Sequence, residues 1–187
     1  TLTTNYIYSI VEDNNKNLWI GTFGSGLVRK NLVTGAVTVY KMNTRLPNSI
    51  PQDWINCLMV DHKGNIWIGT YLGLAYYDTK RNSFVNPLKK NVYLNGIGIF
   101  SLYEDKQGFI WVGTVKGLFR LSPSTQQWQH YTIANGLPNN TICGIEEDEN
   151  QNLWISTHRG LSKYVRSKNT FYNYNTSDGI QGSEFWY

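Results

Sequence analysis

A short pattern occurs four times in this chain: an aliphatic residue, Trp, Ile or Val, Gly or Ser, and Thr. Its tryptophans are Trp19, Trp67, Trp111 and Trp154, which are separated by 48, 44 and 43 residues. Composition bias would not keep so regular a spacing, and periods of about 20–50 residues indicate repeat architectures. Whatever structure one copy forms, the chain must therefore contain four of them.

Other positions keep register with the tryptophans. An aspartate precedes each Trp by six residues, and a Gly-Leu pair follows each Trp. Within the fourth copy, turn-forming residues separate four short segments suited to strands, at 142–147, 153–157, 161–165 and 170–174. Each copy is therefore predicted to be a unit of four short strands. The aspartates are Asp13, Asp61, Asp105 and Asp148, and the pairs start at Gly26, Gly73, Gly117 and Gly160.

The repeated Asp and Trp residues are expected to be structural rather than catalytic or metal-binding. An aspartate at the start of a tight turn accepts hydrogen bonds from backbone N–H groups two or three residues further on. Gly64 and Gly108 supply the positive φ of such hairpins, and Lys16 and Gln151 replace them in the other copies. Each tryptophan is expected to fill the gap between neighbouring sheets.

Composition and charge exclude several classes of protein. Aromatic residues make up 14% of the chain, more than a disordered segment carries. The formal charge of +4 comes from scattered Lys and Arg, without the basic run of a nucleic-acid arm, although it would modestly favour an anionic ligand. Cys57 and Cys143 fit no metal or disulfide pattern and are expected to be small core residues. No stretch approaches the ~18 apolar residues of a membrane span.

The repeat resembles a known family. The pattern Asp-x-x-Gly-x-Leu/Ile-Trp-Ile/Val-Gly-Thr, then Gly-Leu, then Phe-x-x-Tyr, is similar to the two-component regulator propeller repeat. The clearest matches are residues 61–70, 105–114 and 171–185, and residues 135–140 look like that family's loop between blades. Four copies in register make this resemblance more specific than any single motif.

The resemblance implies a function. Such repeats build the periplasmic sensor region of hybrid two-component systems, which are inner-membrane proteins with a histidine kinase and a response regulator. These sensors recognise oligosaccharides released from polysaccharides. We therefore expect a periplasmic, ligand-sensing segment whose partner is an oligosaccharide, which could be anionic. No cofactor, metal or nucleic acid is expected for the segment, and membrane anchoring is expected only through other parts of the parent protein.

Units of this size match propeller blades, so the predicted fold is all-β. We expect four four-stranded antiparallel blades at about 5–48, 53–95, 97–139 and 140–182, with residues 183–187 starting another. The family implies a ring of seven or eight blades, so the chain is expected to be a fragment of a larger propeller. Its terminal blades would expose apolar faces, which predicts self-association, for example as a homodimer of half-rings. Sedimentation tests this expectation.

Ligands of propellers usually bind at one end of the channel. Two sets of loops build that end: those joining strands two and three, and those joining blades. Aromatic faces stack on sugar rings, while Asn, Asp and Arg hydrogen-bond hydroxyls or carboxylates. Trp54, beside Asp53 in the longest inter-blade loop, is the strongest candidate. The other candidates are Asn5, Tyr6, Tyr71, Lys116, Asn140, His158 and Arg159, with Phe23, Arg45 and Glu184 in the same loops.

Motifs of enzymes are absent from the sequence. His62, His130 and His158 show no metal-ligand spacing, and no Gly-x-Ser-x-Gly, P-loop or His-Glu-x-x-His pattern occurs. The segment is therefore expected not to be an enzyme. Two alternatives to a sensor segment stay open. One is a propeller scaffold for dimerisation or protein docking without its own ligand, and the other is a polysaccharide-active lyase or hydrolase that uses dispersed carboxylates.

Overall fold

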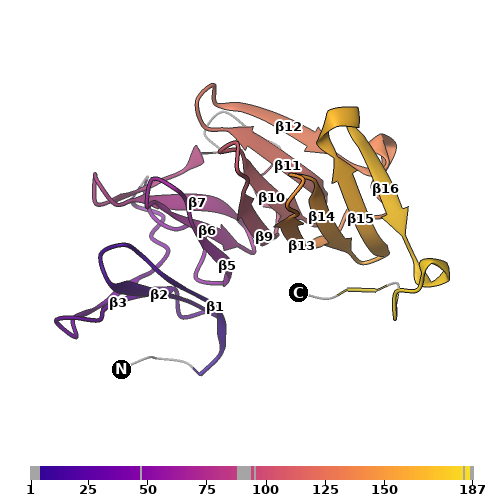
Figure 1. Cartoon of the computed structure of the whole chain (residues 1–187). Coiled ribbons are helices and arrows are strands. Elements are labelled where there is room, and N and C mark those ends of the chain that lie inside the picture. The colour runs from indigo at the N-terminus through magenta and orange to yellow at the C-terminus, as the bar shows by residue number, and fades with distance from the viewer. Residues whose placement is uncertain (1–4, 47, 88–93, 95, 183, 186–187) are drawn as a thin grey trace. The chain divides into compact units, whose positions relative to one another are not determined.

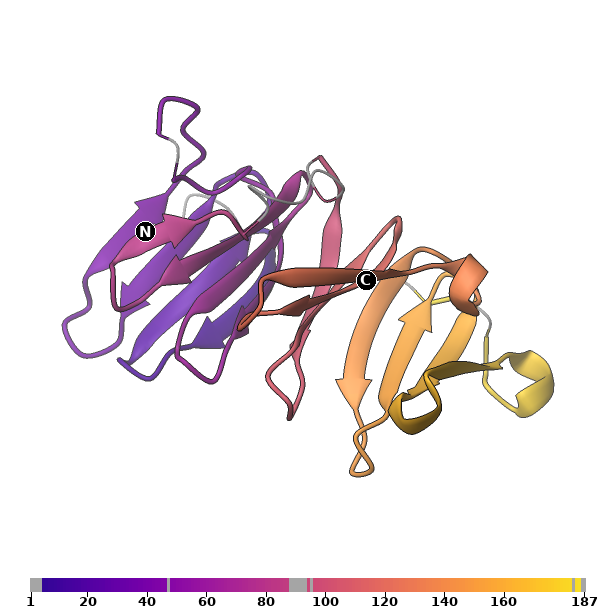
Figure 2. The same ribbon diagram turned by 90° about the horizontal axis from the view of Figure 1, so that it is seen from above.

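The structure is a computed structural model that describes residues 5–46, 48–87, 94, 96–182 and 184–185. Within these residues the chain forms four four-stranded sheets, and in each sheet the strands lie side by side in the order of the sequence (Figure 1). The chain divides into two compact units, residues 1–99 and 100–187, each of which contains two sheets or blades. Figure 2 shows the same sheets from above.

Unit 1 contains blades 1 and 2. Blade 1 consists of β1 (Ile7–Glu12), β2 (Asn17–Thr22), β3 (Leu27–Asn31) and β4 (Val37–Tyr40). Blade 2 consists of β5 (Ile55–Val60), β6 (Ile66–Thr70), β7 (Gly73–Asp78) and β8 (Ser83–Val85). Neighbouring strands are antiparallel and are joined by short hairpins in both blades.

Unit 2 contains blades 3 and 4. Blade 3 consists of β9 (Ile99–Glu104), which begins at the last residue of unit 1, β10 (Ile110–Thr114), β11 (Gly117–Ser122) and β12 (Gln127–Tyr131). Blade 4 consists of β13 (Ile142–Glu147), β14 (Leu153–Thr157), β15 (Gly160–Val165) and β16 (Thr170–Tyr174). The 3₁₀ turns η3 (Ile133–Asn135) and η5 (Thr176–Asp178) follow β12 and β16, and η4 (Arg166–Lys168) precedes β16.

The Trp motifs of blades 2 and 3 form strands that are buried on both faces. Every residue of β6 and of β10 is buried, which explains why these strands are almost continuously apolar instead of alternating. Gly21 in β2 shows how closely the next strand approaches. A Cβ atom there would lie 2.7 Å from Cγ2 of Ile55 in β5, so a larger residue would push the two blades of unit 1 apart.

Two of the four repeated tryptophans pack between two sheets, as predicted. In unit 1, Trp19 is fully buried in a cluster that includes Ile55, Ile66 and Tyr77 of blade 2. In unit 2, Trp111 is fully buried against Ile142 and Tyr164 of blade 4. The all-β fold of four four-stranded antiparallel sheets is therefore confirmed. Of the predicted start of a further blade at 183–187, residues 183, 186 and 187 lie outside the described residues.

The repeated aspartates are structural, but they do more than the turn pattern predicted. Asp13 accepts backbone N–H groups of Asn15 and Asn17, which lie two and four residues further on. It also accepts the indole N–H of Trp19 at 2.8 Å. The same indole bond joins Trp67 to Asp61, Trp111 to Asp105 and Trp154 to Asp148, at 2.9, 2.5 and 3.3 Å. The six-residue spacing thus couples each turn to the core beneath it.

The hairpin turns have the predicted backbone. Gly64 and Gly108 have φ of 82° and 81°, and Lys16 and Gln151 adopt the same left-handed region with φ of 59° and 61°. These two residues confirm that the turn geometry persists where glycine is missing. A non-glycine residue in this region carries a local strain that glycine does not.

Candidate functional site

The two predicted sets of loops meet at one end of blades 1, 2 and 4. In blade 1 the N–H of Phe23, after β2, donates to the carbonyl of Tyr6, before β1, at 3.1 Å. Blade 2 repeats this bond between Tyr71 and Trp54 at 3.2 Å. In blade 4 the N–H of His158 donates to the carbonyl of Thr141, also at 3.2 Å. Side chains from both kinds of loop are therefore presented together.

Unit 1 carries an aromatic row at this loop end. The aromatic row consists of Tyr6, Phe23, Trp54 and Tyr71, whose successive ring centroids lie 6.2, 4.1 and 5.5 Å apart. Tyr6 is 72% exposed and Tyr71 is 49% exposed, while Trp54 is half-buried between Phe23 and Tyr71. Three predicted site residues and Phe23 are thus brought together into one apolar surface that faces solvent.

Sequence reasoning missed one member of this surface. Tyr8 in β1 is 55% exposed and stacks on Phe23 with the ring centroids 5.7 Å apart. Tyr6 and Tyr8 are two residues apart, so the two-residue period of a strand could have placed them on the same face. The indole N–H of Trp54 is buried, and it meets no acceptor within the described part of the chain.

Asp53 and Asn140 lie in the same loops but are bound to the backbone. The carbonyl of Asp53 accepts the N–H of Gly26 at 3.0 Å, and its Oδ1 accepts the N–H of Met42 at 2.6 Å. In unit 2 the carbonyl of Asn140 accepts the N–H of Gly117 at 2.7 Å, and its Oδ1 accepts the N–H of Ile133 at 2.9 Å. Each side chain thus bonds within its own inter-blade loop, while each backbone carbonyl fastens that loop to the preceding blade.

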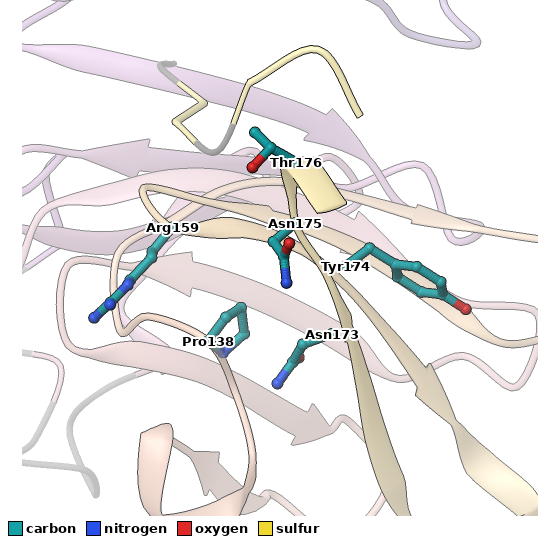
Figure 3. Close-up of a pocket in the computed structure, with 6 residues that line it drawn as sticks. All are labelled: Pro138, Arg159, Asn173, Tyr174, Asn175 and Thr176. Carbon is teal, nitrogen blue, oxygen red and sulfur yellow. The ribbon is translucent and has the colours of Figure 1, made fainter. Parts of the chain in front are cut away.

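The loop end of unit 2 is polar and basic rather than aromatic. Lys116 is exposed, and its carbonyl is 2.8 Å from Nε2 of His130. His158 is half-buried, and Arg159 is exposed beside it. Arg159 lines an open cleft of about 360 Å³, which is the second candidate site (Figure 3). The other lining residues, which sequence reasoning missed, are Pro138, Asn173, Tyr174, Asn175 and Thr176.

The remaining candidates are scattered. Asn5, Arg45 and Glu184 are exposed residues of the inter-blade segments. The backbone N–H of Arg45 donates to Oδ1 of Asn43 within its own loop. Asn5 lies one residue before Tyr6, so it is the member of this group next to the aromatic row.

Few groups in the described residues have the chemistry of a reactive centre. No cluster of three or more His, Cys, Asp or Glu side chains that could hold a metal ion occurs among them. Cys57 and Cys143 are free thiols and half-buried. Burial raises the pKa of the Cys57 thiol to about 12 and that of Cys143 to about 11, so both stay protonated at neutral pH.

These features define a β-propeller blade protein with solvent-facing loop surfaces. The family model named "Two component regulator propeller" matches residues 1–24, 49–72, 93–116 and 136–159, which is one match in each copy. The chain therefore belongs to the two-component regulator propeller family.

Similar proteins agree with this family. The chain is 28% identical over 105 residues to histidine kinase P4 of Formosa agariphila, covering 52% of this chain and 8% of the relative. Among solved structures it resembles the extracellular domain assigned to a hybrid two-component system of B. thetaiotaomicron, with 25% identity and a TM-score of 0.80. That match covers 92% of this chain and 24% of the chain of the B. thetaiotaomicron protein. The chain thus spans only a small part of both proteins.

Enzymes share the fold. Virginiamycin B lyase from Staphylococcus aureus matches 90% of this chain and 55% of its own with a TM-score of 0.69, but with 17% identity. This likeness concerns the fold alone. Among the described residues, no helix has the length and apolar character needed to cross a membrane.

Proposed function

We propose that this chain is the ligand-sensing part of an extracytoplasmic sensor in a two-component signalling system. The similarity to the extracellular domain of a hybrid two-component system supports this role, and the family match supports the same class. The parent protein would be an inner-membrane histidine kinase, with this segment in the periplasm and within a larger ring of seven or eight blades. The segment would bind its ligand without transforming it.

The aromatic row carries the proposal that the ligand is an oligosaccharide. Flat aromatic faces pack on the C–H faces of sugar rings, and the row gathers four rings whose successive centroids lie 6.2, 4.1 and 5.5 Å apart.

Binding can be tested by a thermal-shift screen of the chain against oligosaccharides. A ligand that binds only the native state at 100 times its Kd stabilises that state by about 2.7 kcal/mol, which raises Tm measurably. For any sugar that binds, Tyr71→Ala should weaken the affinity about tenfold, or about 1.4 kcal/mol. The matched control is Tyr172→Ala, since Tyr172 in β16 is 41% exposed but lies outside the row.

The outcomes separate the remaining hypotheses. Equal affinity for the Tyr71→Ala variant and the wild type would remove the aromatic row as the site. Release of products from a bound sugar would favour a lyase or hydrolase instead. A Tm that no oligosaccharide raises would contradict the oligosaccharide proposal for this segment.

A docking scaffold is the second candidate, and one feature favours it. Ile10 in β1 pairs with Ile20, which pairs with Val28, and Val28 pairs with Val39 in β4, so one face of blade 1 carries an apolar strip. Ile10 is 51% exposed and Val39 is 42% exposed. If the strip docks a second copy, sedimentation should show a concentration-dependent dimer that Ile10→Lys abolishes. A monomer at high concentration would contradict self-association.

A further inference from the structure

The cleft beside Arg159 presents hydrogen-bond donors and no carboxylate. It lies at the loop end of blade 4, between Pro138 in the preceding inter-blade loop and the end of β16 (Figure 3). The loop that carries Arg159 is firmly held. The backbone N–H of Arg159 donates to Oγ1 of Thr157 at 3.0 Å, and the hydroxyl of Thr157 donates to the carbonyl of Gly160 at 2.9 Å.

Arg159 differs from the other two arginines of unit 2. The guanidinium of Arg166 binds Asp105 and Glu147, and that of Arg120 lies over the ring of Phe109 at 4.4 Å. The guanidinium of Arg159 has no ion pair or hydrogen bond to any residue that the structure describes. Its five donors therefore remain available to a ligand in the cleft.

The two asparagines of the cleft are oriented by their own bonds. Oδ1 of Asn175 accepts the N–H and the hydroxyl of Ser177, so its Nδ2 points the other way, toward Pro138 and Asn173 (Figure 3). Oδ1 of Asn173 accepts the hydroxyl of Ser162 at 2.7 Å, and its Nδ2 donates to the carbonyl of Gly136 at 2.8 Å. Each Nδ2 thus keeps a hydrogen that a ligand could use.

Asp178 is the acid of the same turn, but it does not line the cleft. Its carboxylate accepts the backbone N–H of Asn175 at 2.9 Å, in the capping box of η5. The cleft therefore combines an uncompensated guanidinium with amide donors, a set that suits an oxyanion.

The corresponding place in blade 3 lacks this combination. Lys116 stands where blade 4 has Arg159, and the imidazole of His130 stands where it has Asn173, with Nε2 2.8 Å from the Lys116 carbonyl. Thr132 replaces Asn175, and its hydroxyl bonds within its own turn to Ala134 and Asn135. Blade 3 has a cation there but no amide donors, so it provides a matched comparison.

We propose that the Arg159 cleft binds the carboxylate or sulfate of an acidic saccharide. A planar guanidinium binds either oxyanion with two parallel hydrogen bonds, and Nδ2 of Asn175 would supply a third donor. This inference rests on the proposed function, because it assumes that the ligand is a saccharide. It adds the chemical class of that saccharide and names the residues that would bind its charged group.

Calorimetric titration of the 187-residue chain with three probes tests the proposal. The probes are tri-galacturonic acid, its methyl ester, and a trisaccharide of otherwise uncharged sugars that carries one sulfate. The acid should bind at least about tenfold tighter than its ester, and Arg159→Gln should remove most of that difference. Asn175→Thr, which keeps the capping oxygen, should weaken binding of the acid by a smaller factor. Tight binding of the acid alone identifies a carboxylate site, and that of the sulfated probe alone identifies a sulfate site.

Lys116→Gln is the control, since it removes the same charge from the equivalent loop of blade 3. It should change the affinity for the acid less than twofold, because a long-range charge effect is screened at physiological salt over about 8 Å. An equal loss in Lys116→Gln and Arg159→Gln would overturn the proposal in favour of general charge attraction. Equal affinity for acid and ester, together with no tighter binding of the sulfated probe, would overturn it while leaving Tyr71-dependent sugar binding intact. Binding of none of the probes, together with a negative thermal-shift screen, would overturn both.

Discussion

Units 1 and 2 pack their blades with the same four rings and differ at both ends of their sheets. The rings of unit 1 are Trp19, Tyr40, Tyr77 and Phe84, and those of unit 2 are Trp111, Tyr131, Tyr164 and Phe171. In each unit the two tyrosines have their centroids 5.8 or 5.6 Å apart, and the phenylalanine meets the first of them edge-on.

At the turn end, unit 2 contains a buried ion cluster that has no counterpart among the described residues of unit 1. Arg166 donates to Asp105 at 2.8 Å and to Glu147 at 3.0 Å, and its side chain is 13% exposed. The positions that match Arg166 and Glu147 in unit 1 hold Thr79 and Val60. At the loop end the contrast is the aromatic row against the basic cleft. Because the packing recurs and the loops do not, residues that recur maintain the fold and residues that differ are candidates for recognition.

The largest expected effect tests whether the two packings are equivalent. Trp19→Ala and Trp111→Ala each remove a fully buried ring from between two blades, and each should cost about 3–5 kcal/mol of unfolding free energy. Urea denaturation followed by circular dichroism measures the loss. Trp154→Ala is the internal control, since Trp154 is only half-buried and should cost less. A loss in one unit more than about twice that in the other would break the equivalence.

The ion cluster of unit 2 gives the next effect. Arg166→Met leaves Asp105 and Glu147 buried without their cation, so it should cost about 3 kcal/mol. Thr79→Ala, at the matching position of unit 1, should change stability by less than about 0.5 kcal/mol. The same denaturation assay compares them.

A double variant sharpens this result. Glu147→Val with Arg166→Thr copies the residues of unit 1 into unit 2, so Asp105 would retain its indole partner as Asp13 does. It should recover most of the stability lost in Arg166→Met. A double variant as unstable as the single one would show that the ion cluster, and not the unpaired carboxylate, determines the loss.

A smaller effect concerns the turn aspartates and depends on pH. Burial alone would raise the pKa of Asp13, but hydrogen bonds from Trp19, Asn17 and Asn15 outweigh it and hold the pKa below the usual 3.8. The ionised form therefore stabilises the fold above about pH 3.8, and this contribution is lost as the pH falls through the lower folded value. Asp13→Asn should cost about 1–2 kcal/mol at pH 7 and progressively less below pH 3.8.

Asp148 in unit 2 provides the comparison for salt. Hydrogen bonds from Lys163, Asn152 and Trp154 outweigh desolvation, so its pKa also lies well below the usual value. The Lys163 ammonium is 2.9 Å from this carboxylate and partly exposed. Added salt should therefore reduce the effect of Asp148→Asn more than that of Asp13→Asn. If salt changed the stability effects of the two variants equally, the ion pair with Lys163 would not distinguish the two turns.

The repeat allowed most of the fold to be predicted, because the strands, turns and buried tryptophans depend on residues close together in the sequence. The hydrogen bond between each indole and its aspartate also had a mark in the sequence, namely the constant spacing of six residues. By contrast, Arg166 meets Asp105 across 61 residues, and the arginine itself occurs in one copy only, so no periodic signal marks this contact. Loop positions selected the members of the aromatic row as candidates but did not show that their rings pack together. Asn173 and Asn175 were missed because only the folded turn orients their amide groups.

The smallest expected effect tests the turns that lack glycine. Lys16 in unit 1 and Gln151 in unit 2 have positive φ, which costs a non-glycine residue about 1–2 kcal/mol, while glycine loses about 0.5–1 kcal/mol more backbone entropy on folding. Lys16→Gly and Gln151→Gly should therefore each stabilise the fold by about 0.5 kcal/mol. The gain should be smaller for Lys16, which also loses its exposed ion pair with Glu12. Gly64→Ala, at φ of 82°, should instead destabilise the fold. A urea denaturation midpoint that moves in the same direction in all three variants would contradict the strain argument.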